Sequence, residues 1–190
     1  DRGGMDIAAM AAAAKAGSLD VLWSLGADGI DYTDFASSFV IYQGHHGDTG
    51  AHHADIVLPG AAYTEKDGIY LNTEGRVQYA NRAAFPPGEA REDWAIIRAV
   101  SGAIGKSIGM DSLNQVRDAL YEALPHFSMP DQIGTAKWAK FGGRAKLTSQ
   151  PITSAIKNFY MTCAMSRASE TMAECRRVQQ ADAAGAVAAE

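Results

Sequence analysis

Three short apolar runs, each closed by Gly or Pro, constrain the fold of this chain most strongly. They are Val21–Leu25 ("VLWSL", followed by Gly26), Phe39–Gly44 ("FVIYQG") and Asp55–Gly60 ("DIVLPG"). β-Branched and aromatic residues between turn-forming residues are typical of strands. Because the runs are continuously apolar, they favour a parallel sheet that is buried on both faces. The sequence therefore predicts an α/β fold with a mostly parallel sheet, whose crossover helices must be short.

Helical patterns lie before and after these runs. An Ala-rich helix is predicted over residues 5–17, ending at Gly17. A second helix is predicted within residues 90–107, with Trp94, Ile97 and Val100 at helical spacing. A third is predicted over residues 111–125, with Asp111 or Ser112 as its N-cap and Pro125 as its end. Its apolar face consists of Leu113, Val116, Leu120 and Leu124. Two short strands are predicted before these two helices, at Ile69–Leu71 and Arg76–Tyr79.

The C-terminal third differs from the rest in composition and in charge. Residues 128–151 mix Gly, Pro and Lys like a strap laid over a surface, and residues 158–180 are helical in character, with Ser166 a candidate cap. Residues 181–190 are expected to fray. Residues 1–125 carry 9 Lys/Arg against 17 Asp/Glu, whereas residues 126–190 carry 8 against 5. We therefore expect an α/β domain over residues 1–125 and an extended tail over residues 126–190 that docks on the body or on a partner subunit.

Composition limits the class of protein. The 190 residues are 47% hydrophobic and 21% charged, which is ordinary for a globular chain, and the net charge of −5 argues against nucleic acid as a partner. Two cysteines are too few for a disulfide framework and favour a reducing compartment. No apolar run is long enough to span a bilayer. Because the chain starts "DRGGMDIAAM", without Met or a signal-peptide layout, we expect it to be processed or cut from something longer.

A histidine cluster is the first candidate site. Imidazoles are common metal ligands, and acids lie nearby at Asp48 and Asp55, but adjacent side chains of an extended chain point apart and the spacing differs from a helical HExxH motif. Histidines that bond to the backbone of a loop explain the pattern equally well, so we expect no metal here. The four residues are His45, His46, His52 and His53.

Glycines and charged residues near the predicted strand ends are the second candidate. Ligands of open α/β sheets bind at the carboxyl edge, so a phosphate or dinucleotide site is conceivable there, but no GxGxxG or GxxxxGK[ST] pattern occurs. Tight turns and charge pairs that pin a turn are the favoured interpretations. The residues are Gly26, Gly29, Gly44, Gly47, Gly50, Gly60, Glu65, Lys66, Asp67, Glu74 and Arg76. Cys163 and Cys175 cannot by themselves hold an iron–sulfur cluster, which ordinarily takes four thiolates.

The segment "ADIVLPGAAYTEKDGIYLNTEGRVQ" resembles a signature of the molybdopterin oxidoreductase superfamily. More narrowly, three motifs in order resemble the family of large iron–sulfur subunits of respiratory complex I (NADH:ubiquinone oxidoreductase). They are "YQGHHGDTGAHHADIVLPGAAYTEK", "PPGEAREDWAIIRA" and, near the C-terminus, "NFYMTCAMSRASETMAEC". The resemblance covers about residues 21–125 and 158–175, the last part of the molybdopterin-like domain, and implies no role for His52 or His53.

The resemblance implies a scaffold in the peripheral arm of complex I. Catalytic, cofactor-binding and metal-binding residues would then all be absent from this chain, and the iron–sulfur clusters would lie on the N-terminal part of the subunit or on a partner chain. The expected partners are that cluster-bearing part and other peripheral-arm subunits. The expected location is the matrix side of the mitochondrial inner membrane or the cytoplasmic face of a bacterial plasma membrane.

Two alternatives stay open. One is a C-terminal fragment of a genuine molybdenum or tungsten enzyme such as a formate dehydrogenase. In such enzymes a further C-terminal β-barrel completes the pterin pocket, and the sequence after Pro125 lacks the many alternating strands that a barrel needs. The other alternative is a free-standing module that binds a metal through the histidine-rich loop.

Overall fold

The structure is a computed structural model that describes residues 3–135, 137, 139, 142–144, 146–152, 154, 156 and 158–187, with side chains up to Ala181. It forms two compact units. The first contains residues 1–45 and 49–135, and the second contains residues 46–48 and 136–190. The predicted organisation into residues 1–125 and 126–190 stays a prediction.

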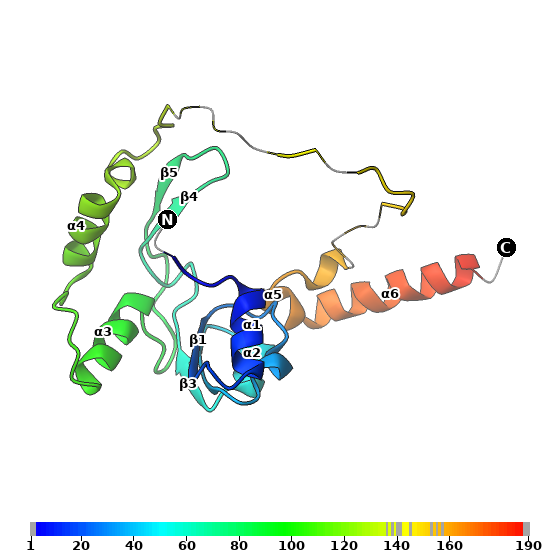
Figure 1. The fold of residues 1–190 in the computed structure, drawn as a ribbon, viewed down its shortest axis with the longest axis horizontal. Helices are drawn as coiled ribbons and strands as arrows, with labels where there is room; N and C mark the ends of the chain where they lie inside the picture. Colours follow the sequence, from blue (N-terminus) through cyan, green and yellow to red (C-terminus); the bar gives the residue numbers. More distant parts are fainter. Residues whose placement is uncertain are drawn as a thin grey trace. The chain divides into compact units, whose positions relative to one another are not determined.

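The first unit contains a three-stranded parallel sheet (Figure 1). The strands are β1 (Val21–Leu25), β2 (Phe39–Gly44) and β3 (Ile56–Pro59), in the order β1-β2-β3. Val21 pairs with Phe39, and Ile41 pairs with Ile56. The predicted α/β fold with a mostly parallel sheet is therefore confirmed, and each strand lies within a predicted apolar run.

One face of this sheet is covered by short helical elements. These are α1 (Ile7–Lys15), the 3-10 helix η1 (Tyr32–Phe35) and α2 (Thr49–His53). Alternate strand residues, Leu22 on β1 and Val40 on β2, pack there with Ala14, Tyr32 and Phe35 to form the core. The brevity of η1 and α2 matches the short spacing between the strands. Asp6 caps α1, and the chain leaves α1 through Gly17 at φ +70°.

The prediction that both faces of the sheet are buried is wrong. On the face opposite the core, Val21 is 50% exposed, Leu25 53%, Phe39 45% and Ile56 44%. Continuous apolar runs indicate that both faces are suited to burial, but in the described part of the chain Gln43 is the one side chain of β1 and β2 that is fully buried on this second face.

The remainder of the first unit is a hairpin followed by two helices. The antiparallel strands β4 (Gly68–Leu71) and β5 (Val77–Ala80) confirm the two predicted short strands. Helices α3 (Asp93–Ala103) and α4 (Leu113–Ala123) confirm the two predicted helices, with Ser112 as the cap of α4. The 3-10 helix η2 (Pro125–Ser128) begins at the predicted stop. Helix α3 buries Ile96 rather than the expected Ile97, which is 37% exposed.

The second unit is helical where it is regular. It contains η3 (Phe159–Met161), α5 (Ala164–Arg167) and α6 (Glu170–Val187). The predicted role of Ser166 as a cap is wrong: Cys163 occupies the cap position, and the Ser166 hydroxyl reaches back to it. The expected fraying from residue 181 is also wrong as far as Val187, because Ala favours helix. Residues 188–190 lie outside the described residues.

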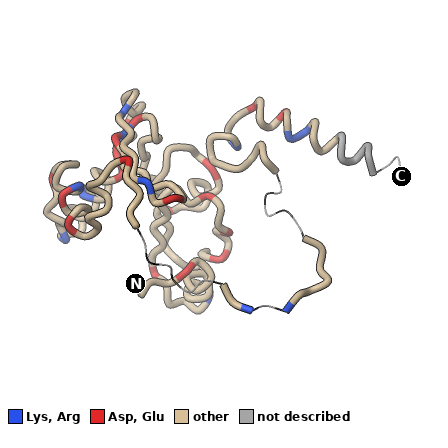
Figure 2. Tube along the Cα trace, turned by 90° about the horizontal axis from the view of Figure 1, so that it is seen from above, with Lys and Arg blue, Asp and Glu red and all other residues tan. Residues whose placement is uncertain are grey.

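Acidic residues outnumber basic ones along the first unit, as the colours of Figure 2 show. Within the described residues, no helix combines the length and the apolar character needed to cross a bilayer.

Candidate functional site

The carboxyl edge of the parallel sheet is where a ligand of such a sheet would bind. β1 ends at Leu25, which is followed by Gly26 at φ +60°. β2 ends at Gly44, and β3 ends at Pro59. Several of the candidate glycines therefore do lie at or just beyond this edge, as the sequence predicted.

The buried ring of Tyr42 fills the space beside two of those glycines. A Cβ on Gly44 would lie 2.4 Å from the Tyr42 hydroxyl oxygen, and a Cβ on Gly50 would lie 2.4 Å from Tyr42 Cδ2. Tyr42 is 1% exposed, and its hydroxyl donates to Asp28 Oδ2 at 2.8 Å. The other oxygen of Asp28 accepts from the Gly50 backbone N–H at 3.0 Å. At these two positions glycine therefore makes room for a tyrosine of the same chain.

A second tyrosine closes the neighbouring part of the edge. Tyr32, also buried, lies with its hydroxyl 2.5 Å from Ser24 Oγ and donates to the Ala27 carbonyl at 2.9 Å. Burial raises the pKa of the Tyr32 hydroxyl above its ordinary value. The ring of His53 stacks on Tyr32 with 5.7 Å between the ring centroids. These contacts make the Tyr32 hydroxyl a neutral structural group at physiological pH.

A chain of polar contacts joins β1, β2 and the start of α3. Gln43 is fully buried; its Oε1 accepts from Trp23 Nε1 at 3.1 Å, and its Nε2 donates to Asp93 Oδ1 at 2.9 Å. Asp93 Oδ2 is paired with Lys66 Nζ. The side chains of Lys66 and Asp93 are 24% and 26% exposed. Lys66, a candidate charged residue, therefore neutralises Asp93 and pins the 60–67 loop to α3.

The turn "NTEGR" is held by its own first residue. Asn72 Oδ1 accepts from the backbone N–H groups of Glu74 at 3.0 Å and of Arg76 at 2.9 Å. Gly75 has φ +86°, a backbone conformation that favours glycine. The Glu74 and Arg76 side chains form a loose ion pair at 3.8 Å. The motif thus encodes the β4–β5 turn itself.

Residues after α4 lie against the same turn. His126 Nε2 lies 2.6 Å from the Gly75 carbonyl oxygen, and Arg76 donates to the Asp131 carbonyl at 2.7 Å. The Asp131 backbone N–H donates to the Val77 carbonyl at 2.8 Å. These contacts hold the turn against its own chain, as expected of a structural element.

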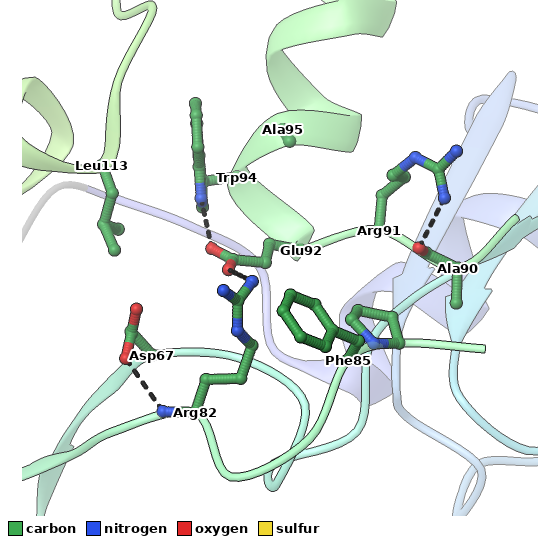
Figure 3. Close-up of a pocket in the computed structure, with 10 residues that line it drawn as sticks. Asp67, Arg82, Phe85, Ala90, Arg91, Glu92, Trp94, Ala95 and Leu113 are labelled. Atoms are coloured by element: carbon green, nitrogen blue, oxygen red, sulfur yellow. Dashed lines mark hydrogen bonds and ion pairs between the residues drawn. The ribbon is translucent and has the colours of Figure 1, made fainter.

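A hollow of about 530 Å³ lies between the 82–92 loop and the starts of α3 and α4 (Figure 3). Glu92 accepts from Trp94 Nε1 at 2.7 Å and lies 3.9 Å from the Arg82 guanidinium, which covers the ring of Phe85. Asp67, another candidate, accepts from the Arg82 backbone N–H at 2.9 Å. These groups are therefore bonded to one another.

The histidines are not gathered into a metal site. His53 Nδ1 lies 2.9 Å from the Thr49 carbonyl oxygen within α2. Over the part of the chain that the structure describes, no three His, Cys, Asp or Glu side chains come together as metal ligands would.

The remaining candidates are dispersed. Gly29 and Gly47 have open space where a Cβ would stand, whereas a Cβ on Gly60 would lie 3.2 Å from Asp93 Oδ1. Glu65 accepts from the Ala62 backbone N–H at 2.9 Å. Cys163 and Cys175 are free thiols, and hydrogen bonds with the side chain and backbone of Ser166 lower the pKa of Cys163.

Sequence reasoning missed the residues that organise this edge, namely Tyr42, Gln43, Asp28 and Asp93. A usable signal was present for Gln43, because a polar residue inside an apolar strand must find partners when it is buried. No comparable signal marked Asp28 or Asp93, since acids in loops and in the first turn of helices are common.

The chain belongs to the molybdopterin oxidoreductase family, whose model matches residues 3–103. Residues 132–175 match a second model, that of the C-terminal region of the G subunit of NADH-ubiquinone oxidoreductase. The predicted resemblance to the large iron–sulfur subunit of complex I, in the later part of its molybdopterin-like domain, is thereby confirmed.

Individual relatives support the same family assignment. The chain is 46% identical over 173 residues to the G subunit of NADH-quinone oxidoreductase from Rickettsia felis, covering 91% of this chain and 26% of that protein. It is 47% identical over 163 residues to the mitochondrial NADH-ubiquinone oxidoreductase 78 kDa subunit of Neurospora crassa, covering 81% and 22%. The chain thus spans about a quarter of the length of these relatives.

Among solved structures, acetylene hydratase from Pelobacter acetylenicus is similar with a TM-score of 0.47 and 17% identity. That match covers 65% of this chain and 19% of the hydratase.

Proposed function

We propose that this chain is a cofactor-free scaffold within the large iron–sulfur subunit of respiratory complex I. On this proposal it completes the molybdopterin-like domain in the peripheral arm, and none of its residues is catalytic or binds a metal. The observation that carries the proposal is the Tyr42 ring, which fills the carboxyl edge of the sheet beside Gly44 and Gly50.

The charges at this edge also suit a scaffold better than a pterin dinucleotide. A dinucleotide presents phosphates, which favour cations and unpaired backbone N–H groups. Here Lys66 is paired with Asp93, and the Gly50 N–H donates to the carboxylate of Asp28. Phosphates placed at the edge would meet these two carboxylates and would have to displace the tyrosine. The residues therefore do not fit the cofactor that the family name implies.

The proposed partners follow from the relatives, which are about four times as long as the matched segment. They are the cluster-bearing N-terminal part of the subunit and other peripheral-arm subunits. The proposed location is the matrix side of the mitochondrial inner membrane or the cytoplasmic face of a bacterial plasma membrane, because the relatives include mitochondrial and bacterial subunits.

Elemental analysis of the purified assembly tests the proposal. We expect iron from the clusters and no stoichiometric molybdenum or tungsten. One molybdenum or tungsten atom per subunit would support the second candidate, a fragment of a pterin enzyme, which the family match favours.

The histidine-rich loop is tested separately. We expect zinc binding to be unchanged between the parent chain and a His45→Ala/His46→Ala variant. Loss of a stoichiometric zinc site in the variant would restore the metal-binding hypothesis.

A further inference from the structure

The hollow beside α3 and α4 has the size and the lining of a small-molecule site. Its volume of about 530 Å³ lies within the range of ligand pockets, roughly 300–1,000 Å³. Apolar and aromatic side chains form much of its wall, namely Phe85, Pro86, Trp94, Ala95 and Leu113. A ligand with an apolar body would therefore bury that body against this wall and gain free energy from the loss of water.

The basic side chains of the wall already have acidic partners. The Arg82 guanidinium lies 3.9 Å from the Glu92 carboxylate. Arg91 is paired at 3.2 Å with Glu89, which does not line the hollow, and Figure 3 shows the Arg91 guanidinium pointing away from Asp67. The positive charge at the hollow is thus offset by the chain itself, and an anionic ligand would find little that attracts it.

Asp67 is the acidic group of the wall that the chain leaves without a cation. Its Oδ1 accepts from the Arg82 backbone N–H at 2.9 Å, and among the described residues no Lys, Arg or His side chain pairs with it. Asp67 is half-buried, and its carboxylate points toward Leu113 (Figure 3). A half-buried carboxylate beside an apolar wall favours a cation that can donate hydrogen bonds to it.

We propose that the hollow binds a small amphipathic organic cation. Its ammonium or amidinium group donates to Asp67, and its apolar body lies against Trp94 and Leu113. The Trp94 indole is held in place for this role, because its Nε1 donates to Glu92 at 2.7 Å.

The same part of the chain already holds a cation against an aromatic ring. The Arg82 guanidinium lies over the Phe85 ring, 4.5 Å from its centre, and such contacts stabilise a cation beside an aromatic face. A phosphate placed in the hollow would instead meet the carboxylates of Asp67 and Glu92. The inference therefore does not concern a pterin dinucleotide, and it stands independently of the proposed function.

Two probes of nearly the same shape test the inference. Benzamidine carries an amidinium group on a phenyl ring, and benzamide is its uncharged counterpart. Each is titrated by saturation-transfer NMR into the complex of the whole chain with the cluster-bearing part of the subunit. The parent is compared with Asp67→Asn, which keeps the oxygen that accepts from the Arg82 N–H. Glu74→Gln is the matched control, since it removes one negative charge on the β4–β5 turn, outside the hollow.

We expect benzamidine to bind the parent with a Kd on the order of 1 mM, and benzamide to bind about tenfold more weakly. Asp67→Asn should weaken the binding of benzamidine about tenfold, because a hydrogen bond between two charged groups is lost, and should leave benzamide unchanged. The Glu74→Gln complex should bind both probes like the parent. Circular dichroism checks that each variant is folded.

Three results would overturn the inference. They are the absence of benzamidine binding to the parent, equal binding of the two probes to the parent, and undiminished binding of benzamidine to a folded Asp67→Asn complex. The comparison of the two probes on the parent decides the matter even if Asp67→Asn does not fold. Binding of inorganic pyrophosphate in place of benzamidine would show that the arginines select an anion, which also contradicts the inference. None of these results alters the metal content by which the proposed function is tested.

Discussion

At the scale of single residues, the packing of Tyr42 explains why glycine occupies positions 44 and 50 at the carboxyl edge of the sheet. A Cβ on Gly50 would lie 2.4 Å from the Tyr42 ring and 2.7 Å from the Tyr32 hydroxyl oxygen. Both rings are buried, so neither can move away without disturbing the core. The backbone of Gly50 does not adopt a positive φ, so its conformation would allow another residue. The close packing of the two rings is what requires glycine at this position.

Gly50→Ala should therefore destabilise the chain by about 1–3 kcal/mol, the usual cost of overpacking a core. Gly29→Ala is the matched control, since a Cβ at that position meets open space. The free energy of unfolding of the co-expressed complex, measured by urea titration, should drop for the first variant and change by less than about 1 kcal/mol for the second. An equal free energy of unfolding for the Gly50→Ala and Gly29→Ala variants would contradict the close packing of Tyr42 against Gly50.

Cys163 supplies a pH-dependent prediction. Hydrogen bonds with the Ser166 side chain and backbone lower the pKa of the exposed Cys163 thiol. The reactive thiolate should thus form at lower pH than in an ordinary cysteine, and iodoacetamide should modify Cys163 faster than Cys175 near neutral pH. Peptide mass spectrometry over a pH series measures both rates. In Ser166→Ala the Cys163 profile should move to higher pH; an unmoved profile would show that Ser166 does not set this pKa.

At the scale of elements, local sequence patterns predicted strands and helices well. The bounds predicted for β2 match the strand, since its β-branched and aromatic residues are flanked by turn residues. Helix α4 begins after Ser112, as its capping pattern indicates. These features depend on neighbours within a few residues along the chain, which a sequence shows directly.

Features that depend on distant neighbours were predicted poorly. The face of the sheet that carries Val21 and Phe39 is predicted to be buried but is partly exposed. Apolar residues show that a face is suited to burial, and they do not show what covers it. The partners of Lys66 and Gln43 were also unforeseen, since Asp93 lies 27 and 50 residues away from them. Tertiary pairing of polar groups is set by the fold, and no local pattern announces it.

The Lys66–Asp93 pair should couple the 60–67 loop energetically to α3. Because both side chains are about three-quarters buried, a double-mutant cycle with Lys66→Met and Asp93→Asn should yield a coupling free energy of about 1–3 kcal/mol. The exposed pair Lys15–Asp34, at 2.7 Å and 62% and 31% exposed, is the control and should yield less than about 1 kcal/mol. Similar coupling in the two cycles would refute the structural role given to the buried pair.

At the scale of the whole molecule, the chain covers about a quarter of its relatives and leaves apolar surface open. Strands β1 and β3 also lie at the edges of the three-stranded sheet, and free edges promote aggregation. The second unit adds further apolar surface, with Leu147 and Ile152 fully exposed. The chain therefore has the properties of one piece of a larger folded body.

Expressed alone, the chain should be poorly soluble, and co-expression with the cluster-bearing part of the subunit should raise its soluble yield and its melting temperature. The measurement is the soluble fraction after centrifugation, followed by a thermal melt. An isolated chain that sediments as a monomer and unfolds in one cooperative transition would contradict this expectation.

Metal analysis of the intact assembly tests the central claim most directly, since it asks whether a domain of the molybdopterin oxidoreductase family still holds the family's cofactor. Mass spectrometry for elements, normalised to the subunit, should find the iron of the clusters together with molybdenum and tungsten far below one atom per subunit. A full atom of either metal in each subunit, released together with a pterin on denaturation, would contradict the scaffold account.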